Sequence, residues 1–109
     1  MLESLFGNKT KEKVLLYLYS YGEGYAQEMR QKLNLPLRSV QLQLKGLEEG
    51  GVLVCRERDR TIVYQINPRY PFYKELTALI EKLFQALPQA TRARFYMPRL
   101  RPRRRGKPL

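Results

Sequence analysis

The sequence predicts a mainly α-helical fold with one small β-hairpin, and three patterns indicate it. Residues 25–51 contain two short amphipathic segments on either side of a break that includes a proline. Two stretches rich in β-branched residues, 52–57 and 61–66, follow directly, and a longer amphipathic segment occupies 72–87. Apolar residues spaced three and four apart are typical of helices, whereas short β-branched runs are typical of strands. The expected order is therefore helix, helix, hairpin, helix.

A further helix is expected ahead of these elements, from Lys11 to about Tyr21. Thr10 is its expected N-cap, because a threonine hydroxyl can accept a hydrogen bond from the free N–H groups of a first turn. The run Gly22-Glu23-Gly24 ends the helix. The tyrosines in and after this helix are expected to pack, within this domain or across a dimer, because aromatic rings bury a large area. A small-molecule pocket is the less favoured interpretation. These tyrosines are Tyr17, Tyr19, Tyr21 and Tyr25.

The two short helices are separated by Asn34-Leu35-Pro36, because proline disfavours a helical conformation at the residue before it. In the second of them, about Leu37 to Glu49, an apolar stripe at helical spacing is expected to be buried. The opposite face carries Arg38, Gln41, Leu42 and Lys45. Two helices around a tight turn, the second with a basic and amide-bearing outer face, form the helix-turn-helix arrangement that enters the DNA major groove.

The β-branched stretches Val52–Glu57 and Thr61–Ile66 predict a hairpin with a charged tip between them. The tip and the end of the first strand carry Arg56, Arg58 and Arg60. Cys55 in the first strand is expected to be a buried, small apolar side chain, which is the usual environment of a free cysteine. A reactive thiol is the minority interpretation.

The segment LNLPLRSVQLQLKGLEEGGVL resembles the helix-turn-helix of winged bacterial and archaeal repressors of the ArsR/MarR type. The resemblance covers roughly Leu5 to Leu87 and departs from the pattern at Pro36 and Leu37, where polar capping residues are usual. It implies a winged helix-turn-helix in which the hairpin is the wing, and in which Arg56, Arg58 and Arg60 contact DNA along the phosphates or in the minor groove. It also implies that the last helix pairs with its two-fold mate. The matching positions are Ser39, Val40, Leu44, Leu47, Glu48, Gly51 and Val52.

The last helix, about Phe72 to Leu87, has an apolar stripe broader than one small domain is expected to cover, and uncovered apolar patches usually mark interfaces. We therefore expect a homodimer that forms through this helix. The expected interface residues are Phe72, Leu76, Leu79, Ile80, Leu83, Phe84 and Leu87. The preceding stretch YQINPRYPFYKEL resembles the wing-to-helix junction of small repressor-like domains, some of which are encoded beside nucleotidyltransferases or fused to them.

The chain is expected to divide into a winged domain, 1–87, and a basic tail, 88–109. The tail holds four of the seven prolines and no acidic residue, so it is expected to be an extended arm that only a partner orders. Phe95, Tyr96 and Met97 interrupt its polar run, and docking on a surface or stacking on bases are the two alternatives for them. It also carries much of the formal net charge of +11, which indicates a polyanionic partner. Its expected DNA-binding residues are Arg99, Arg101, Arg103, Arg104, Arg105 and Lys107.

Several classes of function are not expected. The sequence has no histidine and a single cysteine, so a zinc site of the usual kind and an intramolecular disulfide are excluded within one chain. No constellation of catalytic residues is recognisable, and we expect neither enzymatic activity nor a cofactor. No apolar run is long enough to cross a bilayer and the first residues lack the pattern of a signal peptide, so a cytoplasmic protein is expected.

The expected function is sequence-specific binding of double-stranded DNA by a homodimeric transcriptional regulator. Two alternatives remain open. One is a protein-interaction adaptor, for example an accessory subunit of a nucleotidyltransferase, because a fold does not determine a function. The other is an RNA-binding protein, because arginine-rich segments often fold on RNA. The expected DNA-binding residues of the recognition helix are Leu37, Arg38, Ser39, Gln41, Leu42 and Lys45.

Overall fold

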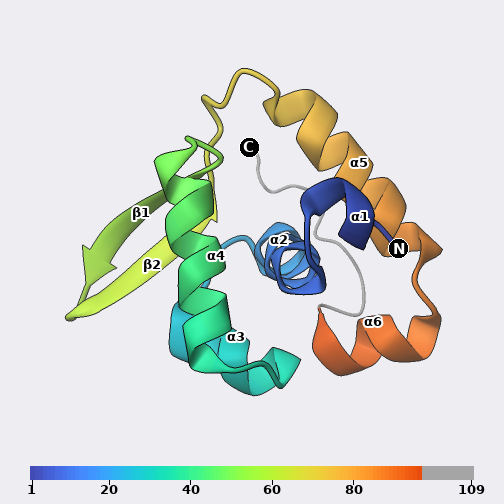
Figure 1. Ribbon diagram of the computed structural model, residues 1–109, viewed down its shortest axis with the longest axis horizontal. Helices are drawn as coiled ribbons and strands as arrows, with labels where there is room; N and C mark the ends of the chain where they lie inside the picture. Colours follow the sequence, from blue (N-terminus) through green and yellow to red (C-terminus); the bar gives the residue numbers. More distant parts are fainter. Residues whose placement is uncertain (97–109) are drawn as a thin grey trace.

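A computed structural model describes residues 1–96 of the chain, and its fold class is the predicted one: mainly α with a two-stranded antiparallel hairpin (Figure 1). The order of the elements is that of a winged helix-turn-helix. The elements are α1 (Glu3–Phe6), α2 (Lys9–Tyr21), α3 (Ala26–Leu33), α4 (Leu37–Glu49), β1 (Leu53–Arg58), β2 (Thr61–Ile66), α5 (Tyr73–Ala86) and α6 (Gln89–Phe95).

Helix α2 is the centre of the molecule. Figure 1 looks along it, and the other elements are arranged around it. Five consecutive residues, from Val14 to Leu18, are at most 2% exposed. A helix that is buried on all its faces must be covered from several directions. Helices α4 and α5 and strand β2 pack directly against α2, so the whole core forms around this one element.

The start of α2 differs from the expectation. Asn8, not Thr10, is the N-cap: its Oδ1 accepts a hydrogen bond of 2.7 Å from the backbone N–H of Lys11. The helix consequently begins at Lys9. Both residue types can cap, and asparagine is at least as good a cap as threonine, so the sequence pattern alone did not distinguish the two positions.

The turn between α3 and α4 is set by two residues with restricted backbones. Asn34 adopts the left-handed conformation, at φ 56°, and its N–H donates to the carbonyl oxygen of Arg30. Pro36 then lies in an extended conformation directly before α4. Neither helix has a side-chain N-cap, so the tight turn depends on this backbone geometry and on packing. The packed residues of the two helices are Met29, Leu33, Val40, Leu44 and Leu47.

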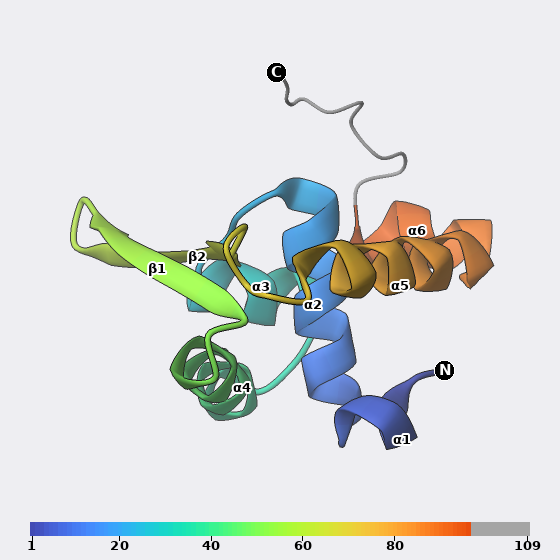
Figure 2. The same cartoon turned by 90° about the horizontal axis from the view of Figure 1, so that it is seen from above.

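The hairpin pairs Leu53 with Ile66 and Arg58 with Thr61, which leaves a two-residue turn at Asp59-Arg60. Both turn residues have positive φ, the conformation that a type I′ turn requires. The hairpin extends outward from the helices (Figure 2), and of β1 only Leu53 is buried. Cys55 is therefore exposed, and the expectation that it is buried is wrong. The helices cover the ribbon along β2, where Val63 and Ile66 are buried, and leave the centre of β1 open to solvent.

Much of the apolar stripe of α5 lies in the core of its own domain. Ile80 and Phe84 are fully buried and Leu83 is 4% exposed, so these three residues are not available to a partner, contrary to the expectation for the dimer interface. Leu76 and Leu87 also pack partly against the core. The stripe is covered because α2 and the end of α6 pack against it, and α6 lies in the segment predicted to be tail.

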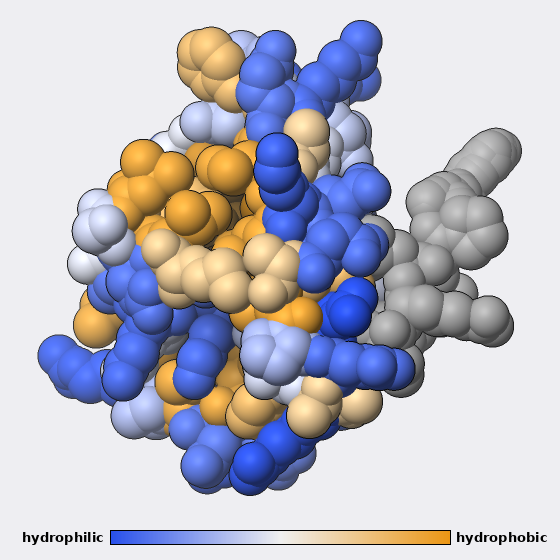
Figure 3. Space-filling view, turned by 90° about the vertical axis from the view of Figure 1, so that its right-hand side faces the viewer, coloured by the Kyte–Doolittle hydropathy of each residue, from blue (hydrophilic) through white to orange (hydrophobic). Residues whose placement is uncertain are grey.

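An apolar patch nevertheless remains on this side of the molecule. Figure 3 looks onto the side that carries α1, α5 and α6, and apolar side chains gather in the upper left of the view. On α5, Phe72 just before the helix is 62% exposed and Leu79 is half-buried. On α1, Leu5 is 65% exposed. The candidate dimer surface is thus reduced to the outer flank of α5 together with exposed residues of α1.

The chain was expected to become extended from Pro88 onward, and this expectation is wrong for residues 89–95. Residues 89–95 form α6, and Tyr96 beyond it is 3% exposed in the core. Its ring meets that of Phe84 edge-on, with centroids 6.4 Å apart. Aromatic residues in the otherwise polar segment drive this docking, because the area that they bury offsets the cost of ordering. The basic tail residues from Arg99 to Lys107 lie outside the described residues.

Within residues 1–96, none of the helices combines the length and apolar character that crossing a membrane requires.

We predict that Tyr96→Ala lowers the free energy of unfolding by about 2–4 kcal/mol, because it removes a buried aromatic ring from the core. Gln89→Ala is the matched control: Gln89 is exposed on the same helix, and its loss should change stability by less than about 0.5 kcal/mol. Urea unfolding followed by circular dichroism measures both. Equal stability of the two variants would contradict the docking of Tyr96.

Candidate nucleic-acid interface

The outer face of α4 is exposed and polar, and it carries most of the residues expected there. Arg38, Gln41 and Lys45 are exposed, and Leu42 beside them is 56% exposed. The opposite face packs into the core. The other two residues expected to bind DNA, Leu37 and Ser39, are half-buried in the first turn of α4. Four of the six expected recognition residues therefore lie on one exposed face.

Helix α4 and the hairpin lie next to each other, on the side of the molecule away from α5 and α6 (Figures 1 and 2). Their junction is held by hydrogen bonds. The side chain of Asn67 donates to the carbonyl oxygen of Gly51 at 2.9 Å, and its backbone N–H donates to that of Val52 at 2.8 Å. Gly51 has a φ of 83°, which favours glycine at this position. These contacts orient the hairpin with respect to α4.

Two of the three arginines of the wing are already paired. Arg56 and Arg58 lie two residues apart on β1 and hence on the same face of the ribbon. Both donate to one carboxylate, that of Glu23 in the loop after α2, at 2.7 and 2.8 Å. Arg60 lies in the turn, and no ion-pair partner for it exists among residues 1–96. The three arginines are therefore not equivalent.

The charges around the wing balance. The three arginines at positions 56, 58 and 60 are equal in number to the acids Glu57 and Asp59 of the hairpin and Glu23 beside it, so the net charge of this group is zero. Hydrogen bonds from Arg58 and then Arg56 hold the pKa of Glu23 below its usual value. Glu23 is consequently ionised at neutral pH. The wing is not the strongly basic element that its arginines alone suggested.

Glu23 was not identified from the sequence, where it is merely the acid within a helix-ending Gly-Glu-Gly run. Its position results from the next residue. Gly24 forms an isolated β-bridge with Tyr64 of β2, with hydrogen bonds of 3.0 and 2.8 Å. Gly24 is buried against Tyr17, and a Cβ at this position would lie 2.7 Å from the Cε1 atom of that ring. No local sequence pattern indicates a pairing between residues 40 positions apart.

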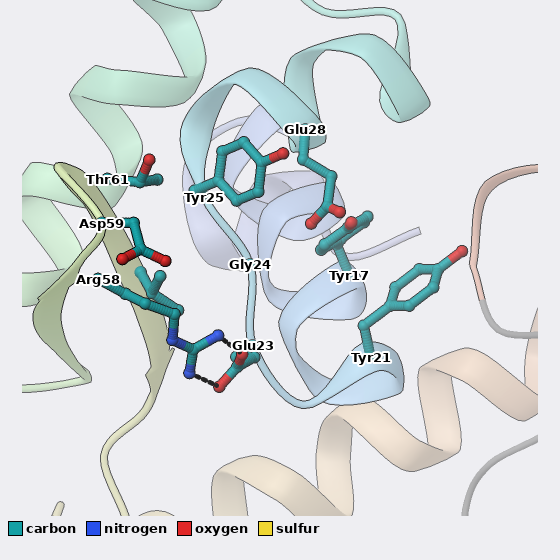
Figure 4. Close-up of a pocket in the computed structure, with 10 residues that line it drawn as sticks. Tyr17, Tyr21, Glu23, Gly24, Tyr25, Glu28, Arg58, Asp59 and Thr61 are labelled. Atoms are coloured by element: carbon teal, nitrogen blue, oxygen red, sulfur yellow. Dashed lines mark hydrogen bonds and ion pairs between the residues drawn. The ribbon is translucent and has the colours of Figure 1, made fainter.

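A hollow of about 400 Å³ lies between the hairpin, α2 and α3 (Figure 4). Tyr17, Tyr21 and Tyr25 contribute to its wall, and the rings of Tyr17 and Tyr21 are 4.4 Å apart. Burial, and then a hydrogen bond with Glu28, raise the pKa of Tyr17. Tyr17 is fully buried, which confirms that it packs within the domain, whereas Tyr25 is 39% exposed at the rim.

No group of three or more histidine, cysteine, aspartate or glutamate side chains in the described part of the chain is arranged to hold a metal ion.

Comparison with known proteins supports the fold and goes no further. The structure is similar to the crystal structure of AF1382 from Archaeoglobus fulgidus, with a TM-score of 0.60 and 21% sequence identity, over 78% of this chain and 94% of that chain. No protein-family model and no curated protein sequence matches the chain. At this level of identity the likeness concerns the fold alone. The resemblance to ArsR/MarR-type repressors therefore remains a prediction.

We predict that Gly24→Ala destabilises the protein by about 1–3 kcal/mol, because a Cβ there overlaps the buried ring of Tyr17. Gly46→Ala is the control. It lies in the interior of α4 with nothing within 4 Å of the added Cβ, so alanine should stabilise the protein by up to about 1 kcal/mol. Thermal or urea unfolding measures both signs. A Gly24→Ala variant at least as stable as the wild type would show that the Gly24 loop is not held against α2.

Proposed function

We propose that the protein binds double-stranded DNA sequence-specifically, as a homodimeric transcriptional regulator without catalytic activity or cofactor. The observation that carries the proposal is the exposed polar face of α4, on a helix whose other face is anchored in the core. A major groove about 12 Å wide admits one α-helix, and a helix that is held rigidly by its apolar side can present the same side chains to base edges each time it binds.

The chemistry of that face suits base edges. Arg38 and Lys45 are exposed, and among residues 1–96 no ion-pair partner exists for either. Their donors fit the O6 and N7 acceptors of guanine. The amide of Gln41 can donate and accept, as the edge of adenine requires, and Leu42 offers apolar contact to a thymine methyl group. Because none of these side chains is committed to the fold, all four are free to specify sequence.

The wing supplies contacts of another kind. Arg60 at the tip has no carboxylate partner in the described part of the chain, and a guanidinium on an exposed turn is suited to a phosphate or to the minor groove. Such contacts contribute affinity and register, whereas base preference comes from α4. The arginines and the lysine between 99 and 107 are proposed to add further phosphate contacts.

The proposed dimer forms through the outer flank of α5 and α1, with a second copy of this chain as the partner. Phe72, Leu79 and Leu5 together leave large apolar groups in water on one side of the molecule. Burying them stabilises an interface in proportion to the area covered. This surface lies away from α4 and the hairpin, so dimerisation leaves both copies of the recognition helix accessible. Two-fold symmetry would match a palindromic site.

A protein-interaction adaptor is the second candidate function, and two observations favour it. The wing with Glu23 has no net charge, and the apolar flank of α5 could equally take a different protein. The two functions differ in the ligand that the exposed face of α4 engages.

The test is selection of bound sequences from random duplexes by the purified full chain, followed by competition with a structured RNA of equal length. Enrichment of a defined motif, with RNA competing weakly, is the expected result. Equal competition by RNA would favour the RNA-binding alternative, and the absence of any enrichment would favour the adaptor.

We predict that Arg38→Ala or Gln41→Ala weakens binding to the selected duplex by about 1–3 kcal/mol and changes binding to random duplex little, because a bidentate base contact is lost. Arg60→Ala is the matched control: it removes a phosphate contact and should weaken binding to both duplexes alike. Fluorescence anisotropy at one fixed salt concentration measures all three variants. Equal losses on both duplexes for Arg38→Ala would exclude a role in base recognition.

We predict that Phe72→Glu together with Leu79→Glu produces monomers and weakens DNA binding roughly a hundredfold, because two linked half-sites bind far more tightly than one. Leu83 is unsuitable for this test, because it lies in the core. Ala78→Glu adds an acid at an exposed position of α5 that lies about 100° round the helix from Leu79, and it should leave the dimer intact. Sedimentation velocity measures the assembly, and a wild-type monomer at tens of micromolar would refute the proposed interface.

A further inference from the structure

We propose that Glu23 restrains DNA binding by the wing: its carboxylate occupies the guanidinium groups of Arg56 and Arg58 until a phosphate displaces it. This inference rests on the proposed DNA-binding function, and it concerns the strength with which that same site binds. It assigns a role to a residue outside both the helix-turn-helix and the hairpin.

The first support is the geometry of the two pairs, of which Figure 4 draws the one between Glu23 and Arg58. Glu23 Oε1 accepts from Arg56 Nη2 at 2.7 Å, and Glu23 Oε2 accepts from Arg58 Nη1 at 2.8 Å. Arg58 Nη2 also reaches Oε1, at 3.4 Å. A carboxylate and a phosphate each present two charged oxygen acceptors, which can accept hydrogen bonds from two N–H donors of one guanidinium. Glu23 thus uses the donors that a DNA phosphate would need.

The second support is that the backbone of Glu23 is anchored. The backbone N–H and carbonyl groups of the neighbouring Gly24 both form hydrogen bonds with the backbone of Tyr64 in β2. Gly24 also lies against the buried ring of Tyr17. The carboxylate therefore stays within reach of β1 whenever the hairpin is folded. A phosphate cannot approach Arg56 and Arg58 without contesting these bonds, and the exchange takes place between side chains without unfolding the loop.

The third support is the charge that remains after exchange. At neutral pH Glu23 is ionised, because its pKa is lowered by the two arginines. Protonation would weaken the pairs only as the pH falls through that lowered pKa, so the trigger at neutral pH is the phosphate itself. Once displaced, the carboxylate is left unpaired near the DNA, and its repulsion opposes binding. Exposed ion pairs are individually weak, so a phosphate array can displace them.

The inference gives Glu23 two expected effects. It reduces the affinity for every duplex, selected or random, because a phosphate contact carries no sequence information. It also leaves base preference unchanged, because that preference belongs to α4. Removing its charge while keeping its shape should therefore raise affinity uniformly.

The experiment compares Glu23→Gln with Glu57→Gln in the full chain, on the selected duplex and on a random duplex across a range of salt. Each variant removes one carboxylate, Glu23 beside the wing or Glu57 within β1. Glu57 is exposed and has no ion-pair partner in the described part of the chain. Glu23→Gln should bind both duplexes about three- to tenfold more tightly than wild type. Glu57→Gln should gain no more than about twofold, through long-range charge alone.

A second comparison separates the pairing from net charge. In a protein that carries Arg56→Gln and Arg58→Gln, the gain from Glu23→Gln should shrink to that of Glu57→Gln, because the arginines that it releases are gone. If the gain persists in that background, or if the two single variants gain equally, Glu23 does not restrain the arginines and the inference fails while DNA binding stands. If neither wild type nor any variant binds duplex at low salt, the proposed function itself is wrong, and this inference with it.

Discussion

The all-round burial of α2 is the constraint on which the rest of the structure depends. A helix that is apolar over five consecutive positions cannot lie on a surface, so it needs neighbours on every side. In a chain of this size those neighbours must include nearly every other element. Even the segment after α5, which includes α6 and Tyr96, contributes to the core. Tyr96 completes the covering, although the sequence around it is polar and basic. The exposed faces of α4 and of the hairpin are what remains once α2 has been enclosed.

The polarity of the molecule is less simple than its net charge suggests. A formal charge of +11 gives the impression of a uniformly basic DNA-binding surface. In the described part of the chain the arginines of β1 are matched by a carboxylate, while the cations on the outer face of α4 are unmatched. In the proposed function, affinity and selectivity would therefore depend on different parts of the protein. The hairpin together with Glu23 has no net charge, whereas the cations of α4 have no ion-pair partner among residues 1–96.

Local patterns predicted what local physics determines. The apolar spacing of three and four residues predicted which face of α4 is exposed. The β-branched runs around a charged turn predicted the hairpin. Both predictions were possible because neither feature depends on distant residues. Apart from the N-cap of α2, which is Asn8 and not Thr10, the errors involve contacts between distant parts of the chain. Cys55 is exposed because no third layer covers β1, and Ile80 and Phe84 are unavailable to a partner because other elements cover them. The pairing of Glu23 with the wing was not predicted, because it depends on the β-bridge between Gly24 and Tyr64, which brings Glu23 close to β1.

The turn at the tip of the hairpin has a consequence for how the wing behaves before any contact. Asp59 and Arg60 both hold left-handed backbones, which costs a residue with a side chain about 1–2 kcal/mol relative to the usual conformation. Asparagine followed by glycine would close the same turn more easily, but the guanidinium at the tip would be absent. This cost lowers the local stability of the tip, so we expect the ribbon to open there first. Arg60, which is proposed to contact a phosphate, therefore lies on the segment of the ribbon that we expect to change conformation most easily.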